Sequence, residues 1–179
     1  MKTLILLLIT ASCFGQPGND CPVKGGSNNA NHQHADSAKN RSAIPDHYDT
    51  VTFDYMAGLT KGDTGTWNRG VMVDCWIMET KAGGQESCNC GSKVFTDTHI
   101  YLAPDSLCRD KKKCIIAEIT PRLRATVGTN WHVGQHVRVY GWLFKDEEHW
   151  PNSVIDAGKS LLWRHTTFEI HPITKIEVL

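Results

Sequence analysis

Residues 134–143 read Gly-Gln-His-Val-Arg-Val-Tyr-Gly-Trp-Leu, and this stretch decides the fold class. Apolar and polar side chains alternate along it, which is the pattern of a β-strand with one buried face. Gly134 precedes the strand and Gly141 stands inside it. A glycine within a strand often marks a sharp bend, and a small closed barrel needs such bends at its corners. The stretch therefore favours a strand that turns a barrel corner.

Four other segments also have strand-like patterns, and turn residues separate them. These segments are residues 71–78, 94–102, 114–120 and 168–179. A short helix is expected over 49–59, and residues 122–133 are expected to be irregular or weakly helical. Five strands with a connection between the third and the fourth is the order of an OB-fold barrel. We therefore predict a mostly β protein with a small five-stranded OB-fold-like barrel, and a two-sheet β-sandwich is the alternative.

The N-terminal end has the features of a cleaved signal peptide. Lys2 gives a positive start, residues 4–9 are an unbroken apolar run, and small residues follow before Gln16. The run is shorter than the roughly 20 residues that span a bilayer. We predict a signal peptide over residues 1–15 and an exported protein, periplasmic or extracellular. Lipoprotein cleavage before Cys13 is the alternative.

The rest of the chain divides into a leader and one domain. Residues 16–43 are rich in Gly, Asn and Ser and have almost no large apolar side chains, so we expect a flexible leader. A single β-barrel-like domain is expected over residues 44–179, with no transmembrane segment. Lys and Arg number 19 and Asp and Glu also number 19, so the chain lacks the basic excess of a dedicated nucleic-acid binder.

Six cysteines follow the predicted signal peptide, and an even number in an exported chain favours disulfides. Cys108 and Cys114 flank a short, basic, turn-like segment, and we predict that they form a bridge. Cys88 and Cys90 are too close in sequence to pair with each other without strain, and Cys75 is a candidate partner for one of them. The sequence leaves the pairing of these three cysteines and of Cys21 open.

Five short segments resemble, in the same order, a group of uncharacterised exported bacterial proteins. The segments are Glu86 to Gly91, Asp97 to Ile100, Glu118 to Arg122, Gly141 to Phe144 and Phe168 to Pro172. Members of the group carry similar E-x-T-P-R and W-E-I-H-P segments, and the resemblance covers most of residues 40–179. It implies no activity, because the group has no assigned function. This chain has Phe168 where the group often has Trp.

Side chains on alternate positions of a strand face opposite sides of the sheet. The apolar positions would fill the barrel, and the polar and aromatic positions would form a surface outside it. The candidate ligand-binding residues are Asp97, His99, Tyr101, Glu118, Arg122, Trp142, His149, Arg164, Glu169 and His171. Six of these residues are expected to form one contiguous polar cluster, namely Asp97, His99, Glu118, Arg122, Glu169 and His171.

Three functions are compatible with this surface. The first is a binding module for an unknown small or polymeric ligand, such as an oligosaccharide, an oligonucleotide or another anionic ligand. The second is a metal-dependent hydrolase with a divalent ion held by His99, His171 and Glu169. The third is a structural or interaction protein of the cell envelope. No hydrolase motif is visible, so the catalytic residues and the oligomeric state stay open.

The signal-peptide prediction has a direct test. The intact mass of the protein recovered after export should match a chain that begins at Gln16, because small residues precede that position. A mass that still includes residues 1–15 would contradict the prediction. A lipid-modified N-terminal Cys13 would support the lipoprotein alternative.

Overall fold

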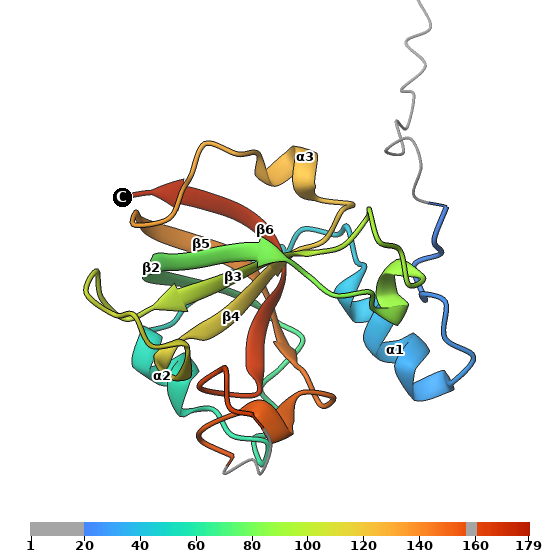
Figure 1. Ribbon diagram of the computed structural model, residues 1–179, viewed down its shortest axis with the longest axis horizontal. Helices are drawn as coiled ribbons and strands as arrows, with labels where there is room; N and C mark the ends of the chain where they lie inside the picture. The colour runs from blue at the N-terminus through green and yellow to red at the C-terminus, as the bar shows by residue number, and fades with distance from the viewer. Residues whose placement is uncertain (1–19, 157–160) are drawn as a thin grey trace, which may run out of the picture.

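Five strands close into a barrel in the computed structural model, which describes residues 20–156 and 161–179 (Figure 1). The barrel strands are β2 (Gly70–Ala82), β3 (Thr98–Ala103), β4 (Ile115–Ile119), β5 (His136–Lys145) and β6 (Phe168–Val178). A further short strand, β1 (Asp49–Thr50), lies outside the barrel order. The helices are α1 (Ala30–Lys39), α2 (Phe53–Gly58) and α3 (Arg124–Val127), with single turns η1 (Ser87–Asn89), η2 (Lys111–Lys113) and η3 (Trp150–Asn152). The predicted signal peptide lies outside the described residues.

The barrel closes because β2 pairs with both β3 and β5. Around the barrel the order is β2-β3-β4-β6-β5, and only the β4–β6 pair is parallel. The short β1 adds a parallel pair to β2. The predicted small five-stranded barrel is therefore confirmed, and the two-sheet alternative is wrong. The second of the five predicted strands, expected to begin at residue 94, corresponds to β3, which begins four residues later at Thr98.

The predicted alternation of strand faces is also confirmed. The inward positions of β3 (Ile100 and Leu102) and of β6 (Phe168 and Ile170) are buried in the central apolar cluster. At Gly141 the register between β5 and β6 shifts. A Cβ atom there would lie 2.5 Å from Ile170 Cγ2, so only glycine lets the two strands approach so closely.

The expectation of a flexible leader is wrong for the part that the structure describes. Residues 30–39 form helix α1, which begins after the N-cap Asn29, whose side chain accepts from the backbone N–H groups of Asn31 and His32. A disulfide between Cys21 and Cys90 ties the segment to the η1 region, with 5.7 Å between the Cα atoms. The sequence gives little sign of this packing, because the buried residues of α1 are the charged Asp36 and Lys39.

The predicted Cys108–Cys114 bridge is not formed. Both residues are buried free thiols, and each sulfur donates a weak hydrogen bond to the Asp110 carbonyl, at 3.7 and 3.5 Å. Burial raises the pKa of the Cys114 thiol to about 12, so the thiol stays protonated. Cys75 is also a free thiol in the barrel core, which excludes it as a disulfide partner here.

Within the described residues, no helix is long and apolar enough to cross a membrane.

The disulfide should stabilise the fold because it closes a long loop, with a sequence separation of 69 residues. Replacing Cys21 and Cys90 together by Ser should lower the free energy of unfolding by about 2–4 kcal/mol, measured by urea denaturation. Reductant should destabilise the wild type by a similar amount and leave the double variant unchanged. A wild type that is insensitive to reductant under unfolding conditions would argue against the bridge.

Candidate functional site

The outward-facing side chains of β3, β4 and β6 meet at one end of the barrel. His99 of β3 lies directly opposite Glu118 of β4 in the strand register. Glu169 and His171 are two positions apart on β6 and therefore share its outer face. Asp97 stands two positions before His99, immediately ahead of β3. The period of the strands thus places five of the predicted cluster residues together.

Covering segments bury this face, although the sequence led us to expect an exposed surface. Helix α1 packs beside η1, and the two lie beyond the end of the barrel (Figure 1). Together with the chain segments 83–97, 146–156 and 161–167, they leave the five side chains between 0% and 7% exposed. Buried charges are costly unless they are paired, so the contacts of each group decide what the site can do.

We call the whole assembly the polar cluster. Its members are Lys39, Glu86, Asp97, His99, Glu118, Asp146, His149, Arg164, Glu169 and His171. They come from α1, from the two connecting segments and from the outer faces of β3, β4 and β6. In the described part of the chain it contains five carboxyl groups against the two permanent cations Lys39 and Arg164.

Arg164 is the centre of the best-paired half. Its guanidinium is fully buried and donates to Asp146 Oδ2 at 2.7 Å and to Glu169 Oε2 at 2.8 Å. It also donates to the Thr166 carbonyl at 2.8 Å. Glu169 in turn accepts from His171 through Nδ1 at 3.1 Å. This chain of contacts fixes the His171 ring and defines its hydrogen-bonding state.

The electrostatics of this half favour ionised carboxylates. Burial alone would raise the pKa of Asp146, but Lys39, the hydrogen bond from His149 and Arg164 hold it below its usual value. The same hydrogen bond, at 2.7 Å, raises the pKa of His149 despite partial burial. Lys39 pairs with Glu86 at 2.9 Å, and nearby carboxylates, Asp146 first, raise its pKa although burial opposes the charge.

The other half is poorly paired. Glu118 Oε1 lies 3.3 Å from His99 Nδ1, whereas Glu118 Oε2 has no hydrogen-bond partner among the described residues. Burial, then the charges of Glu169 and Asp97, raise the pKa of Glu118 well above its usual value. Asp97 Oδ1, His99 Nε2 and His171 Nε2 also lack hydrogen-bond partners within the described chain. Four such atoms in one place need a water, an ion or a ligand to complete their hydrogen bonding.

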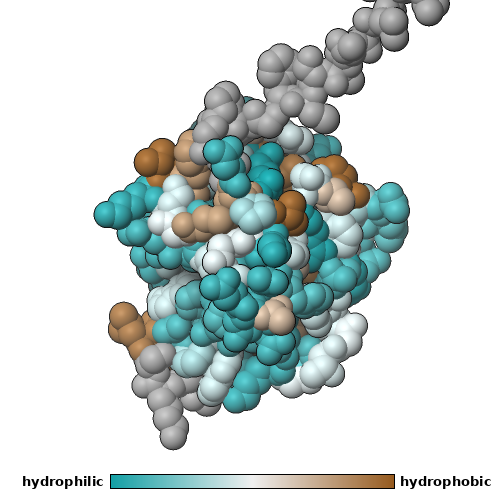
Figure 2. Space-filling model, turned by 90° about the vertical axis from the view of Figure 1, so that its right-hand side faces the viewer, coloured by the Kyte–Doolittle hydropathy of each residue, from teal (hydrophilic) through white to brown (hydrophobic). Residues whose placement is uncertain are grey.

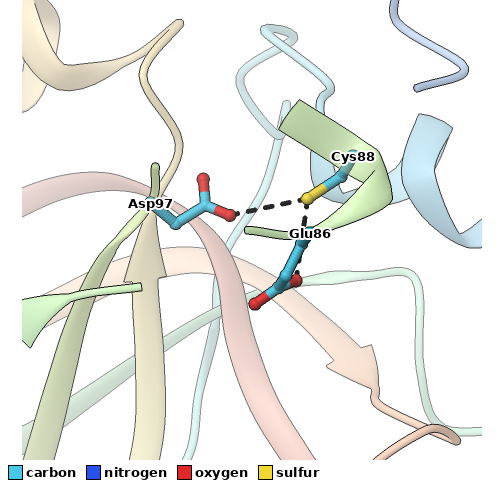
Figure 3. Close-up of side chains that lie close together, drawn as sticks. All are labelled: Glu86, Cys88 and Asp97. Atoms are coloured by element: carbon cyan, nitrogen blue, oxygen red, sulfur yellow. Dashed lines mark hydrogen bonds between the residues drawn. The ribbon is translucent and has the colours of Figure 1, made fainter. Parts of the chain in front are cut away.

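Asp97 also contacts a thiol. Figure 3 shows Cys88 of η1 between the carboxyl groups of Asp97 and Glu86. Its sulfur lies 3.6 Å from Asp97 Oδ2 and 3.7 Å from Glu86 Oε2. Asn89 donates to the same Asp97 oxygen at 3.0 Å. Burial raises the pKa of the Cys88 thiol, which argues against a reactive thiolate.

Two of the predicted site residues lie elsewhere. Arg122 donates to the Cys21 carbonyl and so holds the N-terminal segment instead of joining the cluster. Trp142 donates to the Ala43 carbonyl at 2.9 Å, and the guanidinium of Arg41 stacks on its ring. Tyr101 lies next to the cluster, stacked on the His99 ring at 5.5 Å.

Three members of the cluster were absent from our candidates. Asp146 stands in an Asp-Glu-Glu-His loop, and this run of ligand-type residues is the signal that could have found it. Lys39 and Glu86 meet only in the fold, 47 positions apart, and no helix or strand period in the sequence relates the two positions. Of the six residues expected to form one cluster, the structure brings together Asp97, His99, Glu118, Glu169 and His171, and the separate candidates His149 and Arg164 join them.

An open cavity of about 500 Å³ leads to the cluster over β3 and β4. His99 and Glu118 contribute to its lining, and Trp163, Lys81 and the segment 83–87 complete most of its wall. A second cavity of about 530 Å³ lies against α1 and reaches Lys39 and Asp146. The face that carries α1 is largely hydrophilic (Figure 2), which suits a polar ligand better than an apolar one.

Comparison with known proteins places no constraint on the chemistry. No protein-family model matches the chain, and no curated protein sequence matches it.

Replacing Arg164 by Met should destabilise the protein strongly, because it leaves Asp146 and Glu169 buried without their shared cation. We expect a loss of about 3–5 kcal/mol in the free energy of unfolding at neutral pH, measured by urea denaturation. Since Asp146 has a lowered pKa, its stabilising charge is lost only as the pH falls below the usual Asp range, and the deficit should narrow on acidification.

Arg138→Met is the matched control. Arg138 pairs with Asp74 at 2.6 Å on the surface, where its side chain is 35% exposed and solvent screens the pair, so its loss should cost far less than the loss of Arg164. Equal effects of the two substitutions would contradict the importance that we assign to the buried pair.

Proposed function

We propose that the protein is an exported binding module whose ligand occupies the cavity over β3 and β4. The observation that carries this proposal is the open cavity of about 500 Å³ with an aromatic wall, Trp163, and a polar floor, His99 and Glu118. OB-folds bind oligosaccharides and oligonucleotides on the face of their second and third strands and on the loops beside it. By strand order, β3, β4 and the segments 83–97, 146–156 and 161–167 are the counterparts of that surface.

Charge favours a neutral, hydroxyl-rich ligand over a polyanion. Among the residues that the structure describes, the lining includes Glu86, Glu118 and Glu148 but only one Lys or Arg, Lys81. The ammonium group of Lys81 already lies 5.3 Å from the centre of the Tyr101 ring and 5.7 Å from that of Trp163. Nucleic-acid sites need an excess of cations along the phosphate backbone. Of the ligands that the sequence suggested, an oligosaccharide fits this lining best.

The floor has a hydrogen-bonding group for a hydroxyl. Burial lowers the pKa of His99 to about 4, so the ring is neutral at physiological pH. With Nδ1 directed at Glu118, the unpartnered Nε2 is left for a ligand group. Trp163 packs edge-on against the His99 ring, 5.7 Å between centroids, and offers an apolar surface beside it. An aromatic surface next to polar atoms is the usual composition of a small-ligand site.

The test is a titration of tryptophan fluorescence with chito-, cello- and malto-oligosaccharides and with oligothymidylate. We expect saturable binding of one oligosaccharide series, and Trp163→Ala should weaken it about tenfold or more, since stacking on one ring contributes about 1–3 kcal/mol. Trp150→Ala is the control, because Trp150 is 38% exposed in the same connecting segment but does not line the cavity.

Two results would contradict the proposal. One is an equal loss of affinity in both tryptophan variants, which would place the ligand elsewhere. The other is binding of oligothymidylate alone, with an affinity that falls steeply with salt, since that behaviour marks phosphate recognition.

A further inference from the structure

Three side chains of the polar cluster are spaced as metal ligands. Asp97, Glu118 and His171 each offer one ligand atom, and these atoms all lie within 4.8 Å of one another. All three residues are at most 4% exposed. Asp97 precedes β3, while Glu118 and His171 are on the outer faces of β4 and β6, so a rigid barrel wall holds two of the three.

The state of the His171 ring fits a metal ligand. Nδ1 lies 3.1 Å from Glu169 Oε1, so this nitrogen carries the proton and donates to the carboxylate. Nε2 then has a free lone pair, lies 4.0 Å from Asp97 Oδ2, and has no hydrogen-bond partner in the described chain. Metal-binding histidines almost always donate their other ring nitrogen to a carboxylate or carbonyl in this way. Arg164 holds Glu169 in place from the other side.

The charge balance also favours a cation at this position. Asp97 Oδ1 and Glu118 Oε2 are buried acceptors without hydrogen-bond partners among the described residues. Arg164 and Lys39 lie in the other half of the cluster, where they contact Asp146, Glu169 and Glu86. A divalent ion beside these two oxygens would satisfy both at once, which no hydrogen bond among the described residues does. The nearest nitrogen to Glu118 Oε2 that forms an ion-pair contact is His171 Nδ1, at 3.7 Å.

We infer that Asp97, Glu118 and His171 form a binding site for a divalent transition-metal ion, with zinc as the best match. Two carboxylate oxygens and one imidazole nitrogen are ligands that zinc accepts. Three protein ligands leave one coordination position for water or for a bound group. Glu118 also lines the cavity over β3 and β4, so the ion would lie beside that cavity. The inference does not depend on the proposed oligosaccharide ligand.

A neighbouring group competes for the same ion. Glu86, Cys88 and Asp97 also have ligand atoms within 4.8 Å of one another (Figure 3). This group would bind through a thiolate, whereas the Cys88 thiol directs its hydrogen at the two carboxylates. Glu86 is already paired with Lys39. The first group has the larger number of unpartnered atoms and is therefore preferred.

The test uses the mature protein, treated with a chelator, desalted and titrated with zinc chloride. We expect one zinc ion per chain, and a loss of affinity of at least tenfold in both Asp97→Asn and His171→Gln. Glu169→Gln should weaken binding about 10–100-fold, because Glu169 orients the ring without touching the ion. A double His32→Ala and His34→Ala variant is the control for surface histidines on α1.

Cobalt(II) separates the two groups of ligands. Bound at Asp97, Glu118 and His171, it should show visible d–d bands without the near-ultraviolet charge-transfer band of a thiolate ligand. A thiolate band that disappears in Cys88→Ser would overturn the inference in favour of the neighbouring group. Zinc binding lost in the α1 control but kept in His171→Gln would overturn it as well, and so would the absence of stoichiometric zinc from the wild type.

A substitution can itself lower stability, so the shift in unfolding temperature that zinc causes is measured within each variant. Zinc should raise the unfolding temperature of the wild type and of Cys88→Ser, and it should not raise that of Asp97→Asn. Repeating the oligosaccharide titration in chelator separates the two proposals, because sugar binding without metal binding would refute only the metal site. Metal binding without any sugar binding would refute only the proposed function.

Discussion

The buried contact of Arg164 with Asp146 and Glu169 is the interaction on which the rest of the site depends. It joins the segment before β6, the segment after β5 and the outer face of β6. Removing two carboxylates and a guanidinium from water is costly, and their mutual contacts offset that cost together with the carbonyl of Thr166 and the hydrogen bonds from His149 and His171. Because Glu169 is held by Arg164, it can orient His171, and the position of His171 sets the geometry of the unpaired half.

The uneven pairing within the polar cluster distinguishes a ligand-binding site from a purely structural set of buried charges. In a purely structural set every buried polar group would have a partner, as Arg164 has in its two carboxylates. In the other half, Asp97, Glu118 and His171 each have a buried atom without a hydrogen-bond partner in the described chain. Native proteins rarely leave such atoms unsatisfied unless a water, an ion or a ligand completes them. The same half borders the cavity in which we propose that a ligand binds.

The sequence predicts those features that depend on the period of a strand. Alternation along β3 and β6 placed His99, Glu169 and His171 on the face opposite Ile100 and Ile170, and the barrel order followed from five strands with one irregular connection. It did not predict that this face is covered. Helix α1 has no apolar stripe, and the residues that it buries are charged, with Lys39 paired to Glu86. The Cys21–Cys90 bridge joins residues that are 69 positions apart. Such contacts follow from the fold and leave no local pattern. Arg122 was misplaced for the same reason, because its partner is a backbone carbonyl.

The most direct measurement is a crystal structure of the protein grown with zinc, with diffraction collected at the zinc absorption edge. The expected result is one strong anomalous peak at the outer face of β4 and β6, about 2.0–2.2 Å from a carboxylate oxygen of Asp97, one of Glu118 and Nε2 of His171. A peak on Cys88, a peak only on surface histidines, or no peak with a water molecule bridging the three side chains would contradict a metal site built into the polar cluster.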